Sequence, residues 1–144
     1  MSDLYSQQPA STRWAHVLMR IFAGALLAEH GAQKVFGAFG GIDGAGHAAP
    51  HTFSLIGIAG PLELIGGLLI IVGLYTRVAA FILSGEMAVV YFLFHIERSF
   101  WPIVNRGEIV VVLCFVFLYL AATGAGVFSL DYLRKRKKPN AVMG

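Results

Sequence analysis

Four long hydrophobic stretches, separated by short polar or glycine-rich segments, dominate the pattern of this 144-residue chain. They are residues 14–36, 53–74, 76–96 and 107–124. Each approaches the roughly 20 residues that an α-helix needs to cross the hydrocarbon of a bilayer. The pattern therefore predicts an all-α fold, built as a bundle of four transmembrane helices. The second and third stretches are so close in sequence that we expect them to form an antiparallel hairpin.

The basic residues predict how this bundle is oriented, because cytoplasmic flanks of membrane spans are rich in Lys and Arg. A basic run from Arg134 to Lys138 directly follows the last span. We therefore expect a cytoplasmic C-terminal tail at residues 132–144. With an even number of spans, the N-terminal tail at residues 1–13 lies on the same side. The membrane domain between the tails is residues 14–131.

Composition agrees with a membrane protein and limits its chemistry. The chain is 57% hydrophobic and 13% charged, whereas soluble domains are about 25% charged. The basic tail is a topology signal that also attracts anionic lipids, so the lipid bilayer is an expected partner and nucleic acid is not. The single cysteine, Cys114, excludes an intrachain disulfide and a two-thiol redox relay within this chain.

Two acids fall near the middle of the predicted bilayer, where an unpaired carboxylate costs several kcal/mol. A helical rise of about 1.5 Å per residue places Glu63 and Glu86 at this depth. Gly60 and Gly67 lie on the face of Glu63, and small residues allow another helix to approach closely. We therefore expect Glu63 to point into the bundle.

The middle acids have two interpretations that the sequence leaves open. They form either a buried clamp between helices or a proton or ligand site. Arg20 is the only arginine deep enough to pair with a mid-membrane acid, at roughly 9 Å below the surface. It has the alternative of extending its side chain to the cytoplasmic surface.

A second layer of titratable residues lies toward the outer edge, at Glu29, His30, His95 and Glu108. Carboxylates and imidazoles can relay protons, bind a divalent metal or hold a quinone headgroup. Ordinary structural roles compete with these functions. Asn105 and Glu108 form an N-x-x-E capping pattern typical of a helix start, and His95 shares a helical face with Tyr91.

No metal site is predicted. His47 and His51 lie in the Gly- and Ala-rich loop at residues 37–52, without a metal-ligand spacing such as H-x-x-x-H or C-x-x-C. The chain also lacks a nucleotide-binding loop and a nucleophile beside a base. No independent catalytic motif is therefore present, and whether the protein is an enzyme stays open.

Three blocks of the sequence resemble the DoxX family of small bacterial membrane proteins. They are GPLELIGGLLIIVGLYTRVAAFIL at residues 60–83, GAQKVFG at residues 31–37, and FWPIVNRGEIVVVLCFVFLYLAATGAGVFSLD at residues 100–131. The resemblance extends from about Trp14 to Asp131. It implies a four-helix, multi-pass protein of the bacterial inner membrane. Relatives in this group include the small subunit of a thiosulfate:quinone oxidoreductase.

The resemblance implies a membrane subunit associated with a redox system, either quinone-linked or serving sulfur metabolism or oxidative stress. Quinone is the candidate cofactor, and a soluble redox protein or a second copy of the chain is the candidate partner. Two alternatives remain: a non-catalytic assembly or scaffold subunit, and a small permease component. The candidate catalytic residues are Glu63, Glu29, His30 and His95. The candidate ligand or quinone-binding residues are Gln33, Lys34, Glu86, Trp101, Asn105 and Glu108.

Overall fold

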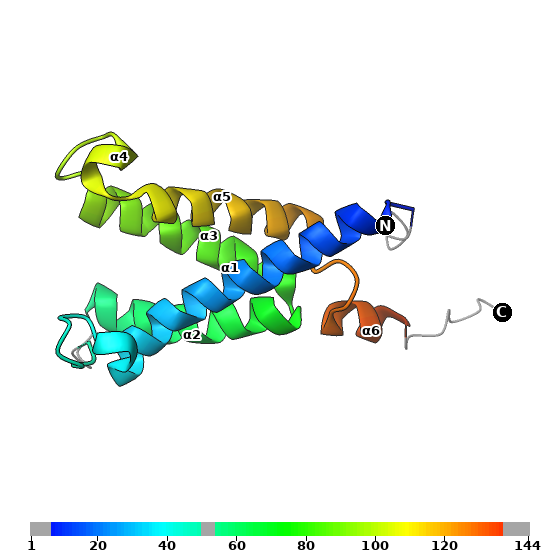
Figure 1. Ribbon diagram of the computed structural model, residues 1–144, viewed down its shortest axis with the longest axis horizontal. Coiled ribbons are helices and arrows are strands. Elements are labelled where there is room, and N and C mark those ends of the chain that lie inside the picture. The colour runs from blue at the N-terminus through cyan, green and yellow to red at the C-terminus, as the bar shows by residue number, and fades with distance from the viewer. Residues whose placement is uncertain (1–6, 50–53, 137–144) are drawn as a thin grey trace.

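The computed structural model describes residues 7–49 and 54–136, and every regular element in these two ranges is helical (Figure 1). The all-α prediction is confirmed. The elements are α1 (Ala10–Phe36), η1 (Ala38–Gly40), α2 (Leu55–Val72), α3 (Thr76–Val90), η2 (Tyr91–His95), α4 (Pro102–Asn105), α5 (Glu108–Thr123) and α6 (Leu130–Arg136). Predictions that concern Phe53, His51, residues 1–6 and residues 137–144 lie outside the described residues.

The observed helix ends agree closely with the hydrophobic stretches, and local chemistry explains them. Helix α1 begins at Ala10 rather than Trp14, directly after Pro9, and ends where Gly37 adopts a left-handed conformation with φ +69°. Glycine is the residue that adopts this conformation without steric cost. Helix α2 begins after Ser54, whose hydroxyl accepts a 3.1 Å hydrogen bond from the Gly57 N–H.

Two helices are long and apolar enough to cross a membrane: α2 and the continuous helix Thr76–His95, in which η2 is a π-helical extension of α3. Helix α5 is also apolar but has 16 residues. Helix α1 is longer, at 27 residues, and carries charged side chains such as Arg20 and Lys34. A bundle of four membrane spans therefore stays a prediction.

The helices form two antiparallel pairs that diverge from a common end (Figure 1). Helix α1 packs against α2, and α3 packs against α5. The connection between α2 and α3 is short, as the sequence predicted. The expected hairpin is nevertheless not tightly packed, because α2 and α3 each make their main contacts with another helix. The two pairs share one hydrophobic core, whose members include Leu27, Ile70, Leu83 and Phe117.

Glycines bring α1 and α2 into backbone contact. A Cβ atom at Gly31 would lie 2.3 Å from the backbone nitrogen of Leu64, and one at Gly67 would lie 2.6 Å from the Gly24 carbonyl oxygen. Neither position tolerates a larger side chain without separating the helices. The close helix approach that the glycines predicted is confirmed, and Glu63 is buried with 2% of its surface exposed.

At the common end, the chain after α5 folds back and covers Arg20. The Arg20 guanidinium donates hydrogen bonds to the carbonyl oxygens of Ala125 (2.6 Å) and Phe128 (2.9 Å). Its side chain is 1% exposed. Both expectations for Arg20 were therefore wrong: it neither pairs with a mid-membrane acid nor extends to the surface. Backbone carbonyl oxygens provide its partners.

Two further contacts hold this folded-back segment in place. The His16 Nε2 atom lies 3.0 Å from the Gly124 carbonyl oxygen. The Asp131 carboxylate accepts 2.9 Å hydrogen bonds from the backbone N–H groups of Tyr75 and Thr76, in the connection between α2 and α3. The segment after α5 therefore closes this end of the molecule, which we call the closed end. The opposite end, where the helix pairs diverge, is the splayed end.

We expect Arg20→Met to lower the free energy of unfolding by roughly 3 kcal/mol, because two buried carbonyl oxygens lose a charged donor. Arg77→Met is the matched control. The exposed Arg77 also donates to carbonyl oxygens, of Ala122 (2.8 Å) and Thr123 (3.2 Å). Water can replace that donor, so its loss costs less. Unfolding in mixed micelles measures the free energy of unfolding of both variants. An equal decrease for Arg20→Met and Arg77→Met would contradict the role of Arg20.

Candidate functional site

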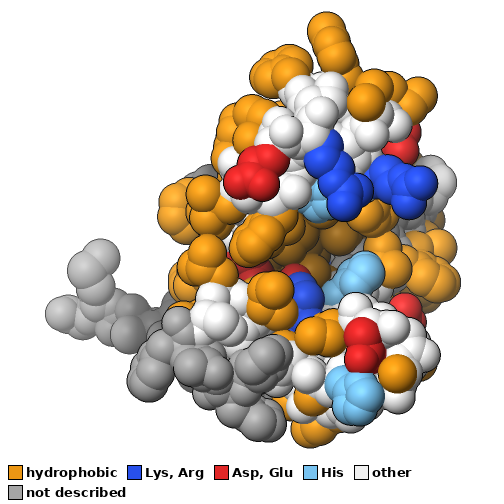
Figure 2. Space-filling model, turned by 90° about the vertical axis from the view of Figure 1, so that its left-hand side faces the viewer, with side chains coloured by type: hydrophobic (Ala, Val, Ile, Leu, Met, Phe, Trp, Pro, Cys, Tyr) orange, Lys and Arg blue, Asp and Glu red, His pale blue; other side chains and the backbone are white. Residues whose placement is uncertain are grey.

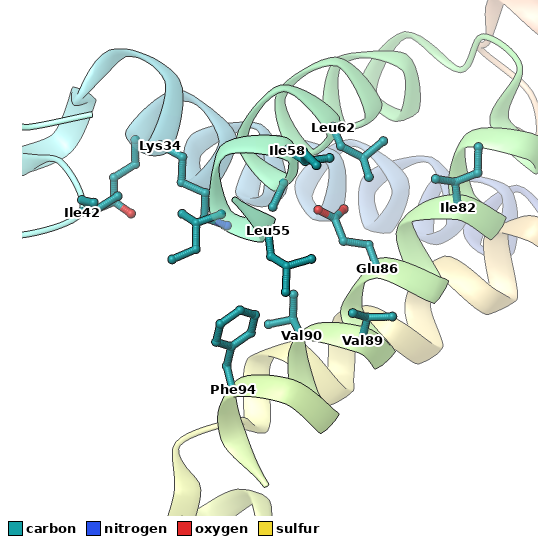
Figure 3. Close-up of a pocket in the computed structure, with 13 residues that line it drawn as sticks. Lys34, Ile42, Leu55, Ile58, Leu62, Ile82, Glu86, Val89, Val90 and Phe94 are labelled. Carbon is teal, nitrogen blue, oxygen red and sulfur yellow. The ribbon is translucent and has the colours of Figure 1, made fainter. Parts of the chain in front are cut away.

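A cavity of about 610 Å³ lies between the two helix pairs toward the splayed end. Figure 2 views this end and shows a hollow between two lobes, with acidic and basic side chains inside it. The cavity lining is mostly hydrophobic and comes from α1, α2, α3 and η2, with Ile42 from the loop after η1 (Figure 3). Its hydrophobic members include Leu55, Ile58, Leu62, Ile82, Val89 and Phe94. Its polar members are Gln33, Lys34 and Glu86.

Glu86 has no hydrogen-bond partner within residues 7–49 and 54–136. Both carboxylate oxygens are buried and unpaired. The carboxylate extends from α3 across the gap toward α2, in the direction of Leu62 (Figure 3). A buried carboxylate without a partner is costly, and the cost is relieved by a proton, a cation or a hydrogen-bond donor. The cavity therefore offers an unused acceptor to whatever enters it.

Lys34 and Glu63 form an ion pair that joins α1 to α2. The Lys34 ammonium donates a hydrogen bond to Glu63 Oε1. The second carboxylate oxygen of Glu63 is buried and has no hydrogen-bond partner among the residues that the structure describes. The side chain of Lys34 is 22% exposed, against 3% for Glu63, so the cation connects the buried acid to the cavity. When all are ionised, Lys34, Glu63 and Glu86 carry a net charge of −1.

The pairing of Glu63 with Lys34 was not predicted, because Lys34 lies at the outer end of the first predicted span, residues 14–36, and Glu63 near the middle of the second. The signal was present in the glycine pattern. Gly60 packs against Lys34, since a Cβ at Gly60 would lie 3.0 Å from the Lys34 Cβ. Glu63 follows Gly60 by nearly one helical turn, a distance that the long lysine side chain spans. Antiparallel packing through glycines thus brings these residues together.

The structure brings four of the predicted site residues together: Gln33, Lys34, Glu63 and Glu86. Glu29 and His30 lie on the last third of α1 and are exposed. Neither lines the cavity. The predicted division into a middle and an outer layer therefore does not describe the site, because Lys34, from the outer end of the first predicted span, pairs with Glu63 and lines the cavity together with Glu86.

His95 and Asn105 belong to a separate cluster of hydrogen bonds beside α4. The His95 Nδ1 atom lies 3.2 Å from the Asn105 carbonyl oxygen. The buried Asn105 amide donates to the Tyr91 hydroxyl (3.2 Å) and the Ser99 carbonyl oxygen (2.8 Å). These contacts fix the turn between η2 and α5, so His95 and Asn105 have structural partners outside the cavity.

The capping pattern predicted for Asn105 and Glu108 was wrong. The Asn105 side-chain oxygen accepts a 2.7 Å hydrogen bond from the Gly107 N–H, before α5 begins. Helix α5 has Gly107 at its N-cap position and no side-chain cap. Asn105 instead ends the short helix α4, which the hydrophobic pattern did not reveal. Glu108 and Trp101 are exposed and do not line the cavity.

The loop after α1 holds an exposed Asp–His pair. The His47 Nδ1 atom lies 2.6 Å from Asp43 Oδ2, and the Ala45 N–H donates to Asp43 Oδ1 at 2.9 Å. The hydrogen bonds from His47 and Ala45 hold the pKa of the Asp43 carboxyl below its usual value. Across the described ranges, no group of three or more His, Cys, Asp or Glu side chains is arranged to hold a metal ion.

We expect Lys34→Met to lower the free energy of unfolding by about 3–5 kcal/mol, because Glu63 is left as a buried charge without its cation. The double variant Lys34→Met/Glu63→Leu should recover most of this loss, since the unpaired charge is then removed. Lys135→Met, an exposed position on α6, is the control and should have no effect. A double variant as unstable as Lys34→Met would contradict the ion-pair assignment.

Comparison with curated proteins gives two relatives. A Haemophilus influenzae (strain ATCC 51907 / DSM 11121 / KW20 / Rd) protein, described as an "Uncharacterized protein", is 47% identical over 77 residues. These cover 51% of this chain and 58% of the relative, so the chain matches less than two thirds of that protein. A Bacillus subtilis (strain 168) protein named "Putative oxidoreductase CatD" is 28% identical over 123 residues, covering 85% of this chain and 89% of the relative.

No solved structure gives a significant match to the chain. The model of the DoxX family matches residues 15–96. This match contains α2, α3 and nearly all of α1, and it includes every polar residue of the cavity. The chain therefore belongs to the DoxX family.

Proposed function

We propose that this protein is a multi-pass protein of the bacterial inner membrane, with four spans and both termini in the cytoplasm. The two apolar helices of membrane-crossing length support this topology. Helices α1 and α5 pack alongside them as the outer members of the two pairs. Arg134, Lys135 and Arg136 end α6 at the closed end, which becomes the cytoplasmic end under the positive-inside rule.

The function that the cavity fits best is that of a membrane subunit of a quinone-linked redox system. The observation that carries this proposal is the unpaired Glu86 carboxylate in a hydrophobic cavity, close to the Lys34–Glu63 pair. A quinone combines a hydrophobic ring with polar oxygens at two positions. Cavities of this kind, largely apolar with a few placed polar groups, are typical of small-molecule sites.

The cavity residues have distinct tasks in this proposal. The hydrophobic side chains of α2 and α3 contact the ring and exclude water. The Lys34 ammonium and the Gln33 amide donate hydrogen bonds to the ligand oxygens, whereas the Glu86 carboxylate accepts a hydrogen bond only from a ligand that carries an O–H group. Electrons come from a soluble redox partner. The oxidoreductase name of the Bacillus subtilis relative supports a redox role.

An assembly role is the second candidate, favoured by the Lys34–Glu63 pair. A buried ion pair between α1 and α2 can fix helix packing without taking part in turnover. The cavity distinguishes the two functions. Assembly requires only the ion pair, whereas quinone binding requires both the ion pair and the open volume of the cavity.

We expect the purified protein in lipid nanodiscs to bind decylubiquinone saturably, and Ala59→Trp to weaken this binding about tenfold or more. Ala59 lines the cavity, so an indole there fills the space for the ring. Leu68→Trp, on an exposed position of the same helix, is the control with unchanged binding. Equilibrium dialysis measures the binding. Absence of binding by the wild type would contradict the quinone proposal and leave the assembly role.

We expect labelling of intact cells to report opposite sides for the two ends of the molecule. In a Cys114→Ser background, Arg98→Cys should react with an impermeant maleimide, and Gln7→Cys should react only after lysis. Arg98 follows η2 at the splayed end, whereas Gln7 precedes α1 at the closed end. Labelling of Gln7→Cys in intact cells would contradict the orientation.

A further inference from the structure

Glu86, which lines the cavity, and the neighbouring Glu63 have buried acceptors that no donor reaches within the described ranges. Three buried carboxylate oxygens, two of Glu86 and one of Glu63, have no hydrogen-bond partner within the described ranges. The Lys34 ammonium donates to the other oxygen of Glu63, and within the described ranges no hydrogen bond joins it to Glu86. An ionised carboxylate only accepts hydrogen bonds. A ligand that pairs with ionised Glu86 therefore brings a donor of its own.

We infer that the cavity binds the reduced, hydroquinone form of its ligand in preference to the oxidised quinone, with Glu86 accepting a hydrogen bond from a ligand hydroxyl. This inference rests on the proposed function, because it assigns the redox state of a quinone-type ligand. A quinone has acceptor oxygens only, and placing one against Glu86 opposes two acceptors. A hydroquinone has the same ring and carries two O–H donors.

Glu86, rather than Lys34 or Gln33, sets this preference. A hydroxyl oxygen and a quinone carbonyl oxygen both accept hydrogen bonds, so the donors on α1 hold either form. Only the carboxylate on α3 distinguishes them, because in its ionised form it accepts hydrogen bonds and donates none. A polar site strongly rejects an analogue that leaves its buried groups unpaired. Hydrogen bonds to a carboxylate are also stronger than those between neutral groups.

The position of Glu86 suits this role. It projects from α3, while Lys34 and Gln33 belong to α1, so the acceptor and the donors come from different helix pairs (Figure 3). A ring with oxygen atoms at opposite positions can bond the Glu86 carboxylate with one oxygen and the donors of α1 with the other. One hydroxyl donates to Glu86, and the oxygen of the other accepts from the α1 side.

Three probes with one ring system test the inference: 1,4-dihydroxynaphthalene, 1,4-naphthoquinone and 1,4-dimethoxynaphthalene. The dimethoxy compound keeps the ring and the oxygens but has no O–H donor. Binding is measured anaerobically by equilibrium dialysis against the full-length protein in lipid nanodiscs. We expect the dihydroxy compound to bind about tenfold more tightly than either of the others, as one hydrogen bond to a charged group provides.

Variants of Glu86 assign the preference to this residue. Glu86→Leu should reduce the affinity for the dihydroxy compound to that for the quinone. Glu86→Gln keeps the shape of the side chain and adds a donor. It should bind the quinone more tightly and so reduce the preference for the dihydroxy compound over the quinone. This variant replaces Glu86→Leu in the test if Glu86→Leu does not fold. Glu29→Gln is the control, because Glu29 is an exposed acid on α1 and does not line the cavity.

The binding results distinguish a failure of the hydroquinone preference from a failure of the proposed quinone site. Equal binding of the dihydroxy compound and the quinone, or a preference that survives in both Glu86 variants, overturns the inference and leaves quinone binding intact. Tight binding of the dimethoxy compound shows that shape alone is recognised and also overturns it. Absence of binding by all three probes, as when a lipid chain fills the cavity, overturns the inference and the quinone site together.

Discussion

The close contact between α1 and α2 through their glycines determines where the charged residues of this protein lie. At Gly31 and Gly67 the two backbones meet with no room for a side chain. This spacing brings the lysine at the end of α1 to the acid in the middle of α2. The pairing lowers the cost of placing both charges in a hydrophobic environment. Without the glycines, the helices would separate and Glu63 would lose its cation.

The two ends of the molecule satisfy their buried polar groups differently. At the closed end, Arg20 finds carbonyl oxygens in the segment after α5, and Asp131 finds backbone N–H groups at the turn before α3. The N–H groups of Tyr75 and Thr76 open α3, and the first N–H groups of a helix have no partner within the helix. Toward the splayed end, Glu86 has no such partner within residues 7–49 and 54–136. This acid lines a cavity, whereas Arg20 is enclosed by the chain, and the proposed ligand site rests on that difference.

Much of the fold could be predicted from the hydrophobic pattern, because helix-length apolar stretches locate the main helices to within a few residues at each end. The inward orientation of Glu63 also followed from its glycine neighbours. The partner of Glu63 could not be predicted in this way, because depth counting treats residues as points and ignores the length of a lysine side chain. Only the packing of α1 on α2 makes Lys34 and Glu63 neighbours.

The partners of Arg20 and Asn105 could not be predicted for another reason. Both donate to backbone carbonyl oxygens of segments that leave the regular helices. Sequence patterns report the hydrophobic faces of helices, but they do not report where a chain folds back after a helix ends. The functional candidates Gln33, Lys34 and Glu86 were identified by residue type and family resemblance, whereas the cavity that unites them required tertiary structure.

The cavity lies between two helix pairs that are joined at the closed end and diverge toward the splayed end. The pairs share their core and their turn near the closed end, so a small rotation there is multiplied with distance along the helices. Phe94, far from the turn, would move more than Ile82, which lies nearer to it. We expect the contacts of Arg20 and Asp131 to influence the width of the cavity, because they hold the two pairs together at the closed end. A substitution at this joint would change the size of ligand that the cavity accepts, although it touches no residue of the cavity.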